Sequence, residues 1–166
     1  MTMTLQSLWC GSNQLASLNV SNSPLLQSLG CDGNQLTSLN VSNNPLLQTL
    51  GCSGNQLTSL NVSNNPLLEY LGCGYNQLTS LDVSNNPLLE QLYCNYNQLT
   101  SLDLSANPHL QTIYCPNNPF LQTQSTTVDF ANSLPDRTGL PAGSVSSGLS
   151  SVWSWIQSIC TAKNWN

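Results

Sequence analysis

Charged side chains are scarce in this chain of 166 residues, and basic ones are almost absent. Only 5% of the residues are Asp, Glu, Lys or Arg, against about 25% in an average soluble protein. The basic residues Arg137 and Lys163 both lie in the last fifth of the chain, so residues 1–136 contain no Lys or Arg. Nucleic acids and anionic lipids are bound through basic surfaces. We therefore expect neither as a partner.

Membrane and export segments are also missing from the sequence. No apolar run reaches the length of a membrane span, which predicts no membrane insertion. The first residues, Met1 to Leu5, include neither the basic stretch nor the apolar core of a secretory signal peptide. No signal peptide is therefore expected in this chain.

Groups of residues that carry catalysis are absent as well. The one histidine, His109, has no nucleophile beside it, and we find no metal cluster or phosphate-binding loop. The sequence predicts no enzyme, no catalytic residue, no cofactor and no metal. Cysteines that point inward from successive strands form a line, whereas zinc needs four converging ligands. Buried cysteine acts as a small apolar residue, so we interpret these thiols as core.

Three residue types recur every 21 positions through most of the chain. They are Cys10, Cys31, Cys52, Cys73, Cys94 and Cys115; Pro24, Pro45, Pro66, Pro87 and Pro108; and Asn13, Asn34, Asn55, Asn76, Asn97 and Asn118. A fixed period of this length indicates a solenoid. Five full coils fill residues 5–109, and a sixth begins at Leu110.

Each coil consists of two similar halves. The second coil reads Leu26-x-x-Leu29-x-Cys31-x-x-Asn34 and then Leu36-x-x-Leu39-x-Val41-x-x-Asn44. Alternation around Leu29 and around Leu39 predicts a short strand in each half, and asparagine suits the corner after each strand. The expected fold is a β-rich solenoid with short parallel strands on two faces.

This pattern resembles the leucine-rich-repeat family, whose core is L-x-x-L-x-L-x-x-N/C-x-L. Residues 5–120 are similar in particular to the nested bacterial type with 21-residue repeats, called IRREKO. That type often has aspartate where this chain has Asn19, Asn40 and Asn61, whereas Asp82 and Asp103 fit it. The resemblance implies binding of a protein or other ligand without catalysis, and an extracellular, cell-surface or virion location.

The end of the chain departs from the repeat. We expect a solenoid domain over residues 1–120 and a C-terminal capping segment over 121–166. Residues 150–163 fit a short amphipathic helix. The segment from Leu134 to Trp165 also resembles the degenerate closing segment of such bacterial proteins.

Outward positions on the first half of the coil vary from repeat to repeat. Tyrosines gather there in coils four to six, beside a column of glycines. They are Tyr70, Tyr75, Tyr93, Tyr96 and Tyr114. Tyrosine offers a large contact area with a polar tip and is enriched at interfaces. These residues are the candidate site for a protein or glycan, unless they merely coat the surface.

Outward positions on the second half barely change. They form a flat hydroxyl-rich face with one threonine column, Thr37, Thr58, Thr79 and Thr100. Such an array resembles the surface of β-solenoid antifreeze proteins, so ice binding is a further, less favoured hypothesis. Two stacked carboxylate pairs, Asp82 with Asp103 and Glu69 with Glu90, are interpreted as solvated surface groups.

Self-assembly is the main alternative to a binding module. The first coil starts at Leu5 with no capping segment before it, and exposed strand edges pair with other chains. A head-to-tail contact that does not close gives a filament, and low charge weakens repulsion between copies. The alternative hypothesis is therefore a filament, surface-layer or virion protein.

Overall fold

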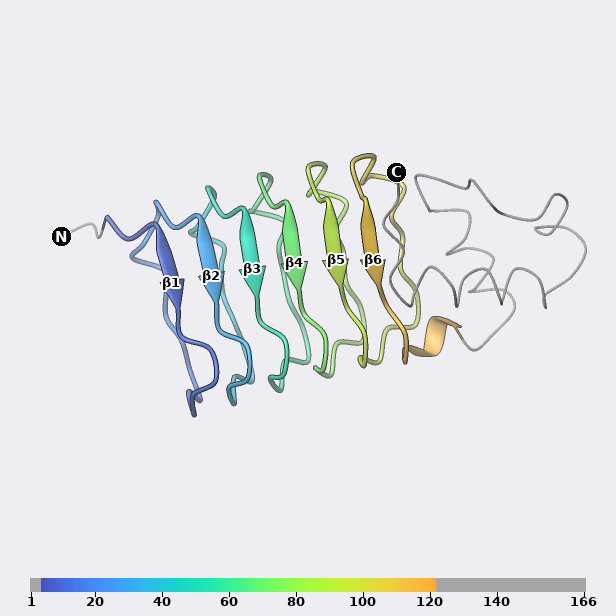
Figure 1. Cartoon of the computed structure of the whole chain (residues 1–166), viewed down its shortest axis with the longest axis horizontal. Coiled ribbons are helices and arrows are strands. Elements are labelled where there is room, and N and C mark those ends of the chain that lie inside the picture. Colours follow the sequence, from blue (N-terminus) through green and yellow to red (C-terminus); the bar gives the residue numbers. More distant parts are fainter. Residues whose placement is uncertain (1–3, 122–166) are drawn as a thin grey trace, which may run out of the picture.

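The computed structural model describes residues 4–121. Within this range, short parallel strands lie side by side along the length of the molecule, and the rest of each coil returns behind them (Figure 1). The strands are β1 (Ser7–Trp9), β2 (Ser28–Gly30), β3 (Thr49–Gly51), β4 (Tyr70–Gly72), β5 (Gln91–Tyr93) and β6 (Thr112–Tyr114), followed by the 3₁₀ turn η1 (Pro119–Leu121). The predicted parallel solenoid is confirmed. The predicted capping helix lies outside the described residues.

The sheet has one register throughout, and it follows the repeat. Leu29 pairs with Leu50, and Gly30 pairs with Gly51, each 21 residues further along the chain. The same offset joins every neighbouring pair of strands from β1 to β6. Equivalent positions of successive coils therefore stack in columns on the surface and in the core.

Leucine and cysteine side chains fill the interior of the coils. Leu29, Leu50 and Leu71 at the strand centres are fully buried, and so are the cysteines from Cys31 to Cys115. No disulfide joins any of the described cysteines. Burial raises the pKa of the Cys31 thiol to about 12. The column is thus part of the apolar core, as the sequence predicted.

Buried asparagines of the first half tie each coil to the one before it. The Asn55 amide donates to the carbonyl oxygens of Cys31 and Cys52 at 3.1 and 3.0 Å. Its Oδ1 accepts the backbone N–H of Leu36 in the preceding coil at 3.0 Å. Equivalent bonds occur at Asn34, Asn76, Asn97 and Asn118. Each asparagine therefore satisfies backbone groups at a corner where the strand ladder has ended.

A second asparagine column lies at the other corner of the coil, and its side chains use only their amide N–H groups for hydrogen bonds. The Asn65 amide donates to the carbonyl oxygens of Val41 and Asn44, both in the preceding coil. Its buried Oδ1 has no hydrogen-bond partner, and the same is true of Asn44, Asn86 and Asn107. This column contributes fewer bonds for each residue than the first.

The second half of the coil differs from the prediction of strands on two faces. Among the described residues, only a single parallel bridge, Asn19 to Asn40, forms there. Asn40 Oδ1 accepts the N–H of Ser42 at 3.0 Å, and Asp82 does the same for Ser84. This local bond takes a backbone donor that a second ladder would need. The prediction of a strand was wrong for this face, where a turn begins at Ser42 directly after the predicted strand.

Candidate functional site

Three of the predicted tyrosines form one aromatic row on the strand face. Tyr70 in β4, Tyr93 in β5 and Tyr114 in β6 are each half-buried. The ring centroids of Tyr70 and Tyr93 are 5.6 Å apart, and those of Tyr93 and Tyr114 are 6.4 Å apart, both tilted. These distances lie within the range of favourable aromatic pairs. The row is therefore a continuous surface made by three adjacent strands.

Tyr75 and Tyr96 form a second cluster in the turns that follow β4 and β5. Their rings stack with centroids 4.4 Å apart and planes 15° apart, and the side chains are 57% and 46% exposed. Both residues have a φ of 52°. The same column holds Gly33 and Gly54 with φ of 64° and 65°, and Ser12 and Asn117 with φ of 55° and 59°.

The left-handed backbone of these turns favours glycine, and a residue with a Cβ adopts it at a cost of about 1 kcal/mol. Two successive coils nevertheless carry tyrosine at this position. The stacked pair is largely open to solvent, so it adds little to the core. Strain of this kind is concentrated at functional sites in proteins, which makes the pair the best marker of a binding role.

The glycine column of the strand face is covered by three side chains, of which the sequence singled out only Tyr70 as a candidate site residue. Each glycine lies beneath one residue: Trp9 over Gly30, Asp32 over Gly51 and Tyr70 over Gly72. A methyl group on Gly51 would lie 2.5 Å from Asp32 Oδ2, and one on Gly72 would lie 3.0 Å from Tyr70 Oη. We call Trp9, Asp32 and Tyr70 the glycine-floor row.

Asp32 is the one acid of this row, and it is only partly exposed. Its Oδ1 accepts the backbone N–H of Ser53 at 2.8 Å. Burial, followed by the negative charge of Asp32, raises the pKa of the Tyr70 hydroxyl above its usual 10.0. The carboxylate therefore acts electrostatically on the neighbouring tyrosine. Sequence inspection could have found Asp32, because its column, from Gly11 to Pro116, changes from each coil to the next.

The opposite half of the coil carries the predicted hydroxyl face. Thr37, Thr58, Thr79 and Thr100 are all exposed. They lie in one column, but the segment has the single bridge described above and is not a second sheet. The ordered strand array that motivated the ice-binding hypothesis is therefore reduced to an exposed threonine column.

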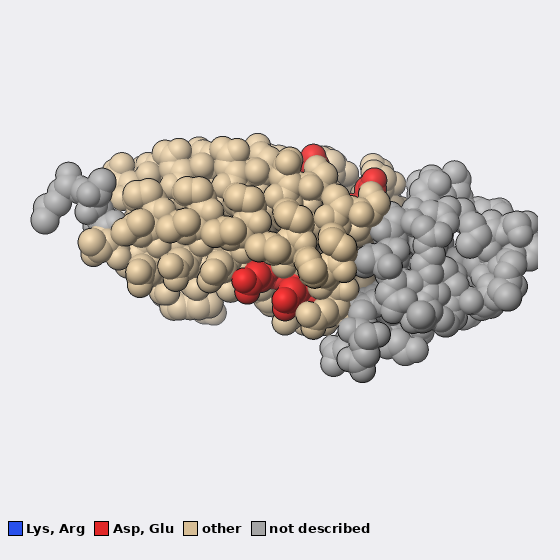
Figure 2. Space-filling model, turned by 90° about the horizontal axis from the view of Figure 1, so that it is seen from above, with Lys and Arg blue, Asp and Glu red and all other residues tan. Residues whose placement is uncertain are grey.

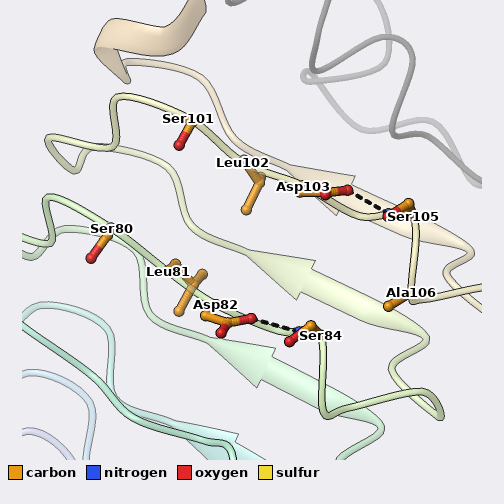
Figure 3. A pocket seen from close by; sticks show the side chains of 9 residues that line it. All are labelled: Ser80, Leu81, Asp82, Ser84, Ser101, Leu102, Asp103, Ser105 and Ala106. Carbon is orange, nitrogen blue, oxygen red and sulfur yellow. Dashed lines mark hydrogen bonds between the residues drawn. The ribbon is translucent and has the colours of Figure 1, made fainter.

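The stacked aspartates line a hollow of about 290 Å³ on that same half (Figure 3). Hydrogen bonds from the side chain and backbone of Ser84 lower the pKa of Asp82, and those from the backbone and side chain of Ser105 lower the pKa of Asp103. Each carboxylate thus stabilises its own turn, as Asn40 does. This agrees with the interpretation of the pair as solvated surface groups.

The charged surface of the described part is entirely acidic. Figure 2 shows small groups of acidic side chains and no basic one on the described surface. Within residues 4–121, no three His, Cys, Asp or Glu side chains gather where they could hold a metal ion. The same range includes no helix that is both long enough and apolar enough to span a membrane.

Comparison with known proteins agrees with this geometry. The family model described as Leucine Rich Repeat matches residues 77–95. The functional domain of InlJ from Listeria monocytogenes, which includes a cysteine ladder, is 39% identical with a TM-score of 0.55. The cysteine ladder of InlJ parallels the cysteine column of this chain. This chain is a leucine-rich-repeat protein. A comparison with curated protein sequences gave no match.

Other leucine-rich-repeat structures have the same coil architecture. A leucine-rich-repeat protein of Leptospira interrogans is 31% identical with a TM-score of 0.67, and the leucine-rich effector protein YopM of Yersinia pestis is 32% identical with a TM-score of 0.51. The alignments with these two and with InlJ each cover 69% of this chain and 32%, 38% and 30% of theirs. The chain thus spans about a third of the length of its structural relatives.

Proposed function

We propose that this leucine-rich-repeat chain is a non-catalytic module that binds a protein through its tyrosine-bearing face. The observation that carries the proposal is the stacked pair Tyr75 and Tyr96, held in left-handed backbone where the second and third coils use glycine. The neighbouring row of Tyr70, Tyr93 and Tyr114 extends the aromatic surface across three strands. Solvent-facing aromatics at this density are typical of interfaces.

The structural relatives support the class of partner. InlJ, the Leptospira protein and YopM share the coil, and solenoid proteins generally use their extended surfaces to bind other proteins. Tyr75 and Tyr96 should lose little conformational entropy when they bind, because their rings already stack on each other. The 21-residue bacterial subtype and a location outside the cell fit this proposal.

The test replaces both turn tyrosines with the glycine found in earlier coils. The Y75G/Y96G variant is expected to unfold with a free energy within about 1 kcal/mol of the parent chain, because relief of the left-handed strain offsets the lost stacking. Binding of a protein captured by the parent chain and then purified should weaken by at least about 100-fold. Calorimetric titration and urea denaturation measure the two quantities.

A matched control changes the other half of the coil. The T58A/T79A variant removes two exposed hydroxyls from the threonine column and should leave the affinity unchanged. Equal binding by Y75G/Y96G and the parent would refute the proposed face. Loss of binding only in T58A/T79A would place the site on the hydroxyl face. If the parent chain itself formed large species on a sizing column, self-assembly would be favoured instead.

A further inference from the structure

One carboxylate stands between two aromatic side chains on the strand face. The glycine-floor row runs from Trp9 through Asp32 to Tyr70, each above a glycine that pairs with the next across β2, β3 and β4. Because paired strands lie about 4.8 Å apart, the carboxylate and the Tyr70 hydroxyl are neighbours. Trp9 is 68% exposed and so remains open to a partner.

The charge of Asp32 is not neutralised within the described part of the chain. Residues 4–121 include no Lys or Arg, and Asp32 Oδ2 accepts no hydrogen bond from any described residue, whereas Oδ1 is used by Ser53. Burial, and after it the charge of Asp32, raises the pKa of the Tyr70 hydroxyl, so this carboxylate acts on its aromatic neighbour. The aspartates of the other half differ, since Asp82 and Asp103 are almost fully solvated and bonded to their own turns.

We propose that the glycine-floor row binds an arginine side chain of a protein partner, with the guanidinium against Asp32 and flanked by Trp9 and Tyr70. This rests on the proposed function and names the chemistry that the same face recognises. A guanidinium is planar, donates hydrogen bonds to carboxylates in pairs, and stacks on aromatic rings. The compact ammonium of lysine matches the carboxylate but gains less from the two flat rings.

Glycine at the same position of three neighbouring strands contributes to the proposed arginine site. Without a Cβ, Gly30, Gly51 and Gly72 let the three covering side chains lie low on the sheet. The row therefore presents two aromatic side chains and one carboxylate above a floor without strand side chains. Asp32 is the one charged side chain of the row itself, so it is the group there that attracts a cation.

The experiment selects randomly sequenced displayed peptides on the immobilised parent chain. Recovered peptides are expected to be enriched in arginine, and to bind Asp32→Asn at least about tenfold more weakly than the parent. The amide introduced by this substitution keeps an oxygen for the Ser53 N–H, so the fold is retained, and thermal unfolding checks this. Asp82→Asn is the matched control, because it removes the same charge from the opposite half and should leave binding unchanged.

A citrulline replacement in the recovered peptide identifies the contact. Citrulline keeps the shape of arginine without its charge, so the citrulline peptide should bind the parent chain and Asp32→Asn equally. Peptides without arginine enrichment, or equal affinity of an arginine peptide for parent and Asp32→Asn, would overturn the arginine site. If the recovered peptides bind Asp32→Asn as tightly as the parent but bind Y75G/Y96G more weakly, the arginine site fails and the proposed function stands. If neither variant weakens their binding, both proposals fail.

Discussion

Replacing Asn55 with alanine is expected to lower the free energy of unfolding by about 4 kcal/mol. The substitution leaves the buried Leu36 N–H without its side-chain acceptor. The carbonyl oxygens of Cys31 and Cys52 each lose one bond but keep those from Asn34 and Asn76. A buried N–H without an acceptor costs about 1–3 kcal/mol, and each further lost hydrogen bond costs about 0.5–1.5 kcal/mol. Urea denaturation followed by circular dichroism measures the loss, which is a large share of the stability of an ordinary domain.

Two other substitutions control for the position of the change. Gln56→Ala, at the neighbouring exposed residue, should alter stability by less than about 0.5 kcal/mol. Asn65→Ala should cost less than Asn55→Ala, because the Asn65 Oδ1 has no partner to lose. If Asn55→Ala and Gln56→Ala were equally stable, the asparagine column could not be what joins the coils.

The rate at which a thiol reagent labels cysteine should be about a thousandfold or more higher in the first coil than in the middle coils. Burial, reinforced by neighbouring thiols, raises the pKa of Cys52 and Cys73 well above the usual 9.0, and both side chains are inaccessible. The reactive thiolate therefore forms only when the coils open. The pKa of Cys10 is also raised, by burial and then by Asp32. Its side chain is partly exposed, however, and for that reason Cys10 should react far sooner than Cys52.

Mass spectrometry of iodoacetamide-treated protein reads each cysteine separately. The difference between Cys10 and Cys52 should disappear in concentrated guanidinium chloride, where every thiol is accessible. Rapid labelling of Cys52 in the native protein would mean that the central coils open freely. That result would contradict a continuous core built from the cysteine and leucine columns.

Most of the fold could be predicted from the sequence because its 21-residue repeat is nearly perfect. Once each coil has 21 residues, stacking alone dictates that Leu29 lies beside Leu50 and that the cysteines form a buried column. The gathering of tyrosines in coils four to six followed from the same offset. Periodicity was therefore sufficient for the core and for the position of the candidate face.

Two features depended on side-chain directions that periodicity does not contain. The apolar alternation around Leu39 predicted a strand, but the bond from Ser42 to Asn40 directs the backbone into a local turn. Asp32 belongs to a different column from Gly51. Its side chain extends over that glycine, and this direction alone places the carboxylate in a row with Trp9 and Tyr70. Periodicity was thus enough to bring the tyrosines together, and their role in binding stays a prediction, whereas the position of the carboxylate between the aromatics needed the structure.

Carbene footprinting of the chain in complex with its captured and purified protein partner tests the binding face most directly. The account predicts that the five tyrosines and Asp32 lose most of their labelling in the complex, while Thr58 and Thr79 on the other half stay as reactive as in the unbound chain. Protection of the threonine column, with the tyrosines labelled as before, would contradict it.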